Sequence, residues 1–291
     1  MEQVQRIAAL FDAVAPTYDA VGVEFFEPIA AGLVTQLAPQ PGERALDLGC
    51  GRGAALVPLA RGVSPGGSAV GVDVSPRMVE SAREAVSAAG LGPDVAVEVR
   101  VGDAQTPDLP AASYDVLASS LVLFFLPDPV DALRSWLRLL VPRGRLGVST
   151  FAGVPAGWEE VDAVFRPYLP PGMLDARTSG RGGPFASDEG VAGLLADAGL
   201  TQVRTAGTTV AVRFADADHW YRWSWSVGQR AMWEAVPAGE RPGVQAEAYR
   251  RLERCRDDDG RIGFDQRVRY TLGSAPGPGP APSADARASR A

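Results

Sequence analysis

Apolar residues recur at spacings of three and four near the start of the chain, the pattern of helices with one buried face. Such stripes run through residues 4–14 and 25–37. The prolines and glycine of residues 39–42 end the second stripe. Residues 1–40 are therefore predicted to form a helical cap.

Strand and helix patterns alternate between residues 41 and 151. Short apolar or alternating segments predict strands at 44–48, 69–73, 95–102, 114–119 and 145–151. Helical periodicity between them predicts helices at 54–61, 76–89 and 128–140. Strict alternation of this kind is typical of an α/β fold, a doubly wound parallel sheet with helices on both faces.

The strict alternation of strand and helix patterns ends after residue 151. A helix is predicted at 187–199, with Ser187 as its N-cap, followed by a strand at 201–214. An aromatic-rich helix should span 216 to about 236, a charged helix 240–256, and a closing strand 261–272. Residues 274–291 are rich in proline and hold no large apolar side chain, which predicts a disordered tail. Residues 152–273 are thus predicted to complete the sheet and to carry a helical insertion at about 216–256.

The composition of the chain argues against several classes of function and partner. The chain has 291 residues and a formal net charge of −7, and all 28 basic residues are arginine, so nucleic acid is an improbable partner. A run of roughly 18 apolar residues is missing, so no membrane span is expected. With no secretory signal pattern and only two cysteines, the chain is predicted to be cytoplasmic. A single histidine excludes a multi-histidine metal site, and the acidic run 257–259 before Gly260 is interpreted as a polar turn, so no metal is predicted.

The segment from Asp47 to Gly53 is the most informative one. It reads Asp-Leu-Gly-Cys-Gly-Arg-Gly and joins the first predicted strand of the sheet to a helix. Glycines there let the backbone approach a ligand closely. Asp73 ends the next strand, where a carboxylate can accept hydrogen bonds from ribose hydroxyls. Dinucleotide sites usually show a different glycine spacing and need no acid ahead of it, which argues against a nicotinamide enzyme.

The pattern resembles motif I of class I S-adenosylmethionine (SAM)-dependent methyltransferases. The sequence is most similar to the small-molecule enzymes related to ubiquinone and menaquinone biosynthesis. The resemblance covers residues 43–151 and extends to the Phe11-Asp12 and Tyr18-Asp19 pairs. It implies a Rossmann-like, mostly parallel seven-stranded sheet with a helical lid inserted between the last two strands, and SAM as cofactor.

The resemblance also implies roles for single residues. Asp47, Gly49 and Gly51 would contact the amino acid end of SAM. Asp73 would bind the ribose, and Val74 and Met78 would pack on the adenine. The remaining cofactor-binding residues implied are Asp103, Ala104, Ser119, Ser120 and Tyr18.

The acceptor site is less well defined by the sequence. Many relatives carry a histidine where this chain has Phe124 and Phe125, so a general base is in doubt. His219, the only histidine, is a weak candidate base. Three further residues, Trp220, Trp223 and Arg222, are candidates to bind the acceptor. The aromatic segment around them would form a lid over the acceptor, a homodimer contact, or ordinary core.

The predicted function is methyl transfer from SAM to an oxygen or nitrogen atom of a small-molecule or modified-peptide acceptor, as in specialised metabolism. The enzyme would act mainly through proximity and desolvation. The alternative is a SAM-binding relative that catalyses a different reaction, such as a cyclisation.

Overall fold

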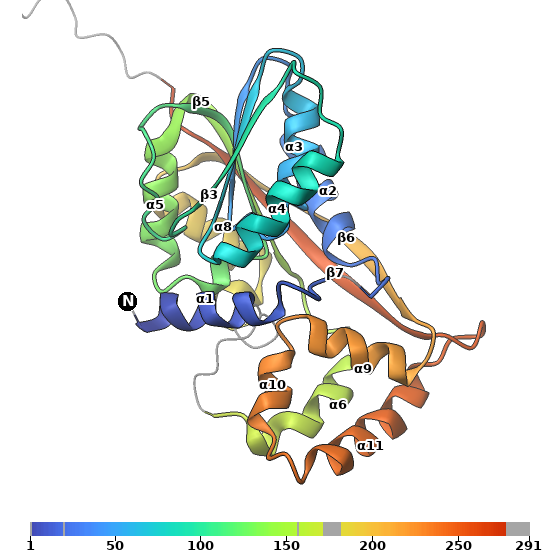
Figure 1. Ribbon diagram of the computed structural model, residues 1–291. Helices are drawn as coiled ribbons and strands as arrows, with labels where there is room; N and C mark the ends of the chain where they lie inside the picture. The colour runs from blue at the N-terminus through green and yellow to red at the C-terminus, as the bar shows by residue number, and fades with distance from the viewer. Residues whose placement is uncertain (1, 20, 156, 171–181, 278–291) are drawn as a thin grey trace, which may run out of the picture.

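The computed structural model describes residues 2–19, 21–155, 157–170 and 182–277 (Figure 1). Its centre is a seven-stranded sheet of order β3-β2-β1-β4-β5-β7-β6. The first five of these strands are parallel, and β7 is antiparallel to both β5 and β6. The strands are β1 Arg44–Leu48, β2 Ser68–Asp73, β3 Ala96–Val101, β4 Tyr114–Ser120, β5 Leu140–Phe151, β6 Thr201–Phe214 and β7 Ile262–Ser274. The predicted α/β, doubly wound architecture is confirmed.

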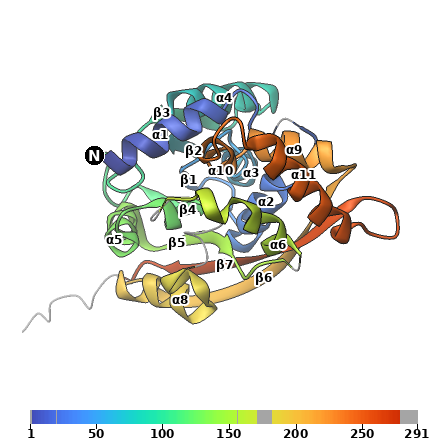
Figure 2. The ribbon, with the colours of Figure 1, turned by 90° about the horizontal axis from the view of Figure 1, so that it is seen from below.

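Helices cover both faces of the sheet, as Figure 2 shows. On one face, α2 (Phe26–Leu37) packs on β4 and β5, α3 (Leu56–Val63) on β1 and β2, and α4 (Pro76–Ala88) on β2 and β3. On the other face lie α5 (Pro129–Leu139) and α8 (Asp188–Asp197), which pack on each other. Fully buried side chains such as Leu33, Leu46 and Trp136 fill the space between these layers. The expected helices are present because their apolar stripes match these contacts.

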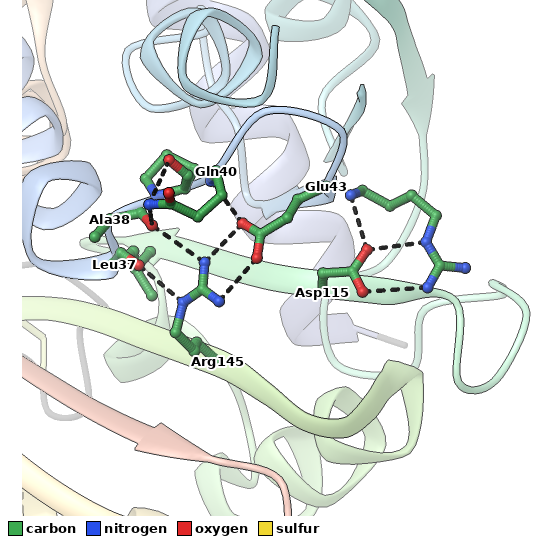
Figure 3. A network of polar contacts seen from close by, with 8 residues as sticks. Leu37, Ala38, Gln40, Glu43, Asp115 and Arg145 are labelled. Carbon is green, nitrogen blue, oxygen red and sulfur yellow. Dashed lines mark hydrogen bonds and ion pairs between the residues drawn. The ribbon is translucent and has the colours of Figure 1, made fainter. Parts of the chain in front are cut away.

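Ion pairs hold the strands together at the end where β1 and β4 begin (Figure 3). The Arg145 guanidinium donates to both carboxylate oxygens of Glu43, at 2.9 and 2.7 Å, and to the Leu37 carbonyl at 2.9 Å. Arg44 forms a second pair with Asp115 at 3.0 Å. These contacts join the end of α2 to the sheet where its parallel strands begin. The cavity described below lies at the opposite edge, where these strands end.

A group of short helices lies beyond the other end of the sheet (Figure 1). Between β6 and β7 the chain forms α9 (Ala217–Ser226), α10 (Arg230–Ala235), α11 (Arg241–Leu252) and η4 (Glu253–Cys255). The chain after β5 adds α6 (Trp158–Asp162) and η2 (Ala163–Tyr168), which contact α10 and α11. Between η2 and α8 lies the short η3 (Gly183–Ala186). We call the set α6, η2, α9, α10, α11 and η4 the helical layer.

Two sequence expectations about this region were wrong in detail. The helix expected from 216 to about 236 is broken, because Val227 is extended and Gly228 has a low helix propensity. The helix expected at 240–256 ends at Leu252 and continues as η4. The contribution of α6 and η2 was not anticipated, because their short apolar pattern is interrupted by Pro167.

The N-terminal helix α1 (Glu2–Val14) lies across the end of the sheet that faces the helical layer (Figure 1). Asp12 anchors it to α4, since its carboxylate accepts from Ser75 Oγ at 2.5 Å and from the Arg77 backbone N–H at 3.2 Å. The Gln3 side chain donates to the Phe125 carbonyl at 3.0 Å. The first helix therefore lies against the edge of the sheet where the parallel strands end.

The last strand, β7, includes Ser274, and Ala275 is buried, so the sheet extends one residue into the segment predicted as the tail. The rest of the predicted tail, 278–291, lies outside the described residues. Among the helices that the structure describes, none is long and apolar enough to cross a membrane.

Candidate cofactor and acceptor site

The turn after β1 brings backbone close to the neighbouring strands. Gly49 has φ +74°, a conformation that favours glycine, and a Cβ there would collide with the Val122 side chain. The N–H groups of Gly49 and Cys50 donate to the Val72 carbonyl at 2.8 and 2.9 Å. The turn is thus tied to the end of β2, and at Gly49 it leaves no room for a side chain.

Asp47 is buried beneath this turn. The residue is 1 % exposed, and neither carboxylate oxygen makes a hydrogen bond of good geometry with a described residue. Burial, and the nearby charge of Asp73, raise the pKa of Asp47 to about 8, a shift that the Leu56 backbone N–H opposes only in part. A buried carboxyl group without a partner is costly, and an ammonium group would compensate it. The site therefore fits the amino group of a ligand.

Asp73 is held at the end of β2 by two backbone donors. Its Oδ2 accepts from the Gly51 N–H and its Oδ1 from the Ser75 N–H, both at 2.9 Å. Burial raises the pKa of Asp73, while these bonds oppose the shift. Each oxygen keeps capacity to accept a further hydrogen bond, of the kind that a ribose hydroxyl would donate.

A cavity opens where β1, β2, β3 and β4 end. Its cofactor end is lined by residues that follow these strands, with Tyr18 of the N-terminal segment above them. These lining residues are Gly49, Gly51, Asp73, Val74, Met78, Asp103, Ala104 and Ser120. Tyr18 stacks on Phe26, with ring centroids 4.7 Å apart. An adjoining depression is lined by Asp47, Gly49, Gly51 and Ser120. The lining residues fit the amino acid, ribose and adenine parts of SAM.

The other end of the same cavity is apolar and aromatic. Phe25, Phe125, Phe151, Trp158 and Trp223 line it. Phe25 lies edge-on to Trp223, with centroids 5.7 Å apart, and Phe125 edge-on to Phe11 of α1 at 5.7 Å. The wall therefore combines α1, the start of α2, the 3₁₀ turn after β4, β5, α6 and α9, of which the sequence patterns indicated only a part.

Further lining residues come from four places that the sequence analysis did not single out. These places are α1, the segment after β4, the break between α9 and α10, and one position on β7. The residues are Val4, Ile7, Leu121, Val122, Leu126, Pro127, Val227, Gly228, Gln229 and Gln266. The run after β4 continues the predicted Ser119–Ser120 signal, but no local motif marks the positions at 229 and 266.

Several predicted site residues lie elsewhere. Ser119 is fully buried and donates to the Leu48 carbonyl at 2.8 Å, because it and Ser120 face opposite sides of β4. Phe124 and Trp220 are buried in the core outside the cavity lining, and Arg222 is exposed. Only Phe125 and Trp223, of the predicted acceptor-binding residues, reach the cavity.

His219 is a structural residue in this geometry. Its Nδ1 accepts from the Ala215 N–H at 3.1 Å, so the proton resides on Nε2, which donates to the Val21 carbonyl at 2.7 Å. The ring joins the start of α9 to the N-terminal segment and does not line the cavity. His219 therefore has no free nitrogen with which to act as a base.

The acidic run 257–259 forms a polar turn. The Asp257 carboxylate accepts from the Arg261 N–H at 2.9 Å, and Gly260 has a positive φ of +77°. No group of three or more potential metal ligands comes together in the part of the chain that the structure describes.

The buried acids at the ends of β1 and β2, the glycine turn and the aromatic cavity define a SAM-dependent methyltransferase. A family model described as a methyltransferase domain matches residues 46–148. The nocamycin O-methyltransferase of Saccharothrix syringae is 37% identical to the chain, over 84% of this chain and 89% of the relative. The chain belongs to the family of SAM-dependent methyltransferases, and its cofactor is SAM.

Two other similarities extend the comparison. The aklanonic acid methyltransferase of a Streptomyces strain is 37% identical, over 59% of this chain and 76% of the relative. The crystal structure of the [4+2]-cyclase SpnF matches with a TM-score of 0.58 at 18% identity, over 94% of this chain and 96% of the cyclase. At that identity the second likeness concerns the fold alone.

Proposed function

We propose that the protein transfers the methyl group of SAM to an oxygen atom of a small, largely aromatic acceptor in specialised metabolism. The observation that carries this proposal is the aromatic cavity, which continues directly from the cofactor end at Gly49, Asp73 and Asp103. The nocamycin relative is named an O-methyltransferase, which supports an oxygen atom as the methylated position.

The residues of this chain would act mainly by binding and by excluding water. Asp47 would pair with the amino group of SAM, and Asp73 would hold its ribose. When bound, SAM supplies a methyl group on a sulfonium centre, which is activated toward nucleophiles. The aromatic wall around Phe125 and Trp223 would desolvate the acceptor and orient it beside the cofactor.

The acceptor end offers no evident general base. The cavity-lining residues that the structure describes include no histidine, lysine or arginine. The lining carboxyl groups, Asp73 and Asp103, follow β2 and β3 at the cofactor end. We therefore infer an acceptor that is nucleophilic without help near neutral pH, such as an acidic phenol or a carboxylic acid. The second relative is named for aklanonic acid, which supports an acidic acceptor.

Proposals about the kind of acceptor, the oligomeric state and the location follow from the sequence and the cavity. A small molecule fits the apolar, aromatic cavity better than a modified peptide does. A homodimer and a cytoplasmic location remain predictions from the sequence.

The first test is calorimetric titration of the full chain with S-adenosylhomocysteine (SAH), with NADH as the control ligand. Micromolar binding of SAH alone supports the cofactor site. Incubation with SAM and a panel of phenols and aromatic carboxylic acids should then yield SAH together with a product heavier by one CH₂ group. A product of unchanged mass without SAH formation would instead indicate a cyclase-type reaction on this fold.

A further inference from the structure

One polar side chain interrupts the apolar wall of the cavity at the break between α9 and α10. Gln229 follows Val227 and Gly228, lines the cavity, and is only 3 % exposed. A buried amide in such a wall requires hydrogen-bond partners for both its oxygen and its nitrogen.

The orientation of this amide is set by α6. Gln229 Nε2 donates to Asp162 Oδ1 at 3.2 Å. A carboxylate only accepts hydrogen bonds, so the nitrogen of the amide must face Asp162 and the oxygen must face away from it. The contact also joins two parts of the helical layer that are 67 positions apart in the sequence.

The oxygen of this amide has no partner. Gln229 Oε1 is fully buried, and no donor in the described part of the chain lies within hydrogen-bond distance. A buried acceptor left without a hydrogen bond costs about 1–3 kcal/mol. This oxygen has almost no exposed surface, so a donor on a bound molecule reaches it once the amide shifts toward the cavity that the side chain lines.

Gln266, the second amide of the cavity wall, follows the same logic. Its Nε2 donates to the Arg267 carbonyl at 2.7 Å and to the Gly153 carbonyl at 3.4 Å. The chain itself engages both amide nitrogens. These two side chains therefore offer hydrogen-bond acceptors to a bound molecule.

We propose that Gln229 is the acceptor-recognition residue, whose amide oxygen accepts a hydrogen bond from a hydroxyl group of the bound acceptor. The class of acceptor is then a hydroxylated aromatic compound, with the recognised hydroxyl distinct from the atom that is methylated. Asp162 is a positioning residue that keeps the oxygen available. This inference rests on the proposed function and deepens it.

The test compares two neutral probes, 1-naphthol and 1-methoxynaphthalene, which differ in the hydroxyl donor. Binding to the SAH-saturated protein is measured by tryptophan fluorescence, since Trp158 and Trp223 line the cavity. In the unaltered protein, 1-naphthol should bind roughly 10-fold more tightly. In Gln229→Leu the two affinities should become equal, mainly through weaker binding of 1-naphthol.

Gln245→Leu is the matched control, because Gln245 lies on α11 in the same helical layer and does not line the cavity. It should keep the preference for 1-naphthol. Asp162→Asn, which lets the amide turn over, should reduce the preference while leaving SAH binding unchanged.

Three outcomes would overturn the assignment: equal affinities in the unaltered protein, no saturable binding of either probe, or an unchanged preference in Gln229→Leu. In the last case a buried water, and not the acceptor, would satisfy the amide oxygen. SAH titration of each variant separates the two levels. If SAH binds normally and the preference is absent, only the role of Gln229 fails, whereas loss of SAH binding in the unaltered protein refutes the proposed function itself.

Discussion

Asp47→Asn offers the sharpest test of the cofactor site, because the carboxyl group is buried without a partner and its pKa is raised to about 8. In the ligand-free protein the group is protonated at neutral pH. A bound ligand brings an ammonium group, which favours the ionised form. Binding of SAH should therefore release a proton from Asp47 whenever the pH is below about 8.

The magnitude follows from the shift. The pKa of Asp47 rises from 3.8 to about 8, and each unit corresponds to about 1.4 kcal/mol. Because the folded pKa is raised, this group lowers stability progressively as the pH rises from 3.8 to about 8, by on the order of 5 kcal/mol in total. The ligand-free Asn variant should therefore be more stable than the unaltered protein at pH 8.

The same shift governs affinity. The dissociation constant for SAH should fall about tenfold per pH unit as the pH rises toward the pKa of about 8. Asp47→Asn should bind SAH with little dependence on pH in this range. At pH 8 its affinity should be roughly 10- to 100-fold lower, as expected for a lost hydrogen bond between charged groups. Near pH 6 the two proteins should bind similarly, because there the unaltered protein must give up a proton to bind.

The assay is calorimetry at several pH values, in two buffers with different ionisation enthalpies. At pH 7 the unaltered protein should release close to one proton per SAH bound, and the variant none. Measurements are kept below about pH 7.5 for the proton count, where a free α-amino group is mostly charged. An affinity that is independent of pH, with no proton released, would refute the assignment of Asp47 to the amino group of the ligand.

Three other predictions concern residues around the same cavity. Asp73→Ala should weaken SAH binding roughly 10- to 100-fold by calorimetry, and unchanged affinity would contradict its ribose role. His219→Ala removes two contacts to backbone groups, so urea unfolding should show a loss of about 1–3 kcal/mol while methyl transfer is retained; loss of turnover with an altered pH profile would restore the histidine as a base. Asp12→Ala frees α1 from α4, so SAH should dissociate faster and the amides of α1 should exchange faster with deuterium, and no change in either would show that other contacts hold α1.

The sequence predicted the cofactor end of the cavity well because the information there is local. Asp47, Gly49 and Asp73 lie at strand ends, and in a parallel sheet the ends of neighbouring strands meet at one edge. A glycine with positive φ and an acid at the end of a strand can be recognised without any knowledge of distant contacts. Asp103 and Ser120 follow from the same rule.

Errors in the site arose where neighbouring residues face different ways. Ser119 and Ser120 both matched the expected position, but the alternation of a strand sends only Ser120 to the cavity. Phe124 and Phe125 lie in a single turn of 3₁₀ helix, and only Phe125 faces the ligand side. Strand periodicity, applied more strictly, would have resolved the serines but not the phenylalanines.

The acceptor end could not be predicted because long-range contacts place each part of its wall. Val227–Gln229 become wall residues only because α9 ends at Ser226, and the amide of Gln229 is oriented by Asp162, a residue of another insertion. The cofactor contacts at 47–120 are instead set by the strands themselves. The two ends of the cavity can therefore change independently: substitutions in the helical layer should alter the choice of acceptor while the affinity for SAH is retained. This separation explains how one family motif occurs in relatives named for different acceptors, such as nocamycin and aklanonic acid.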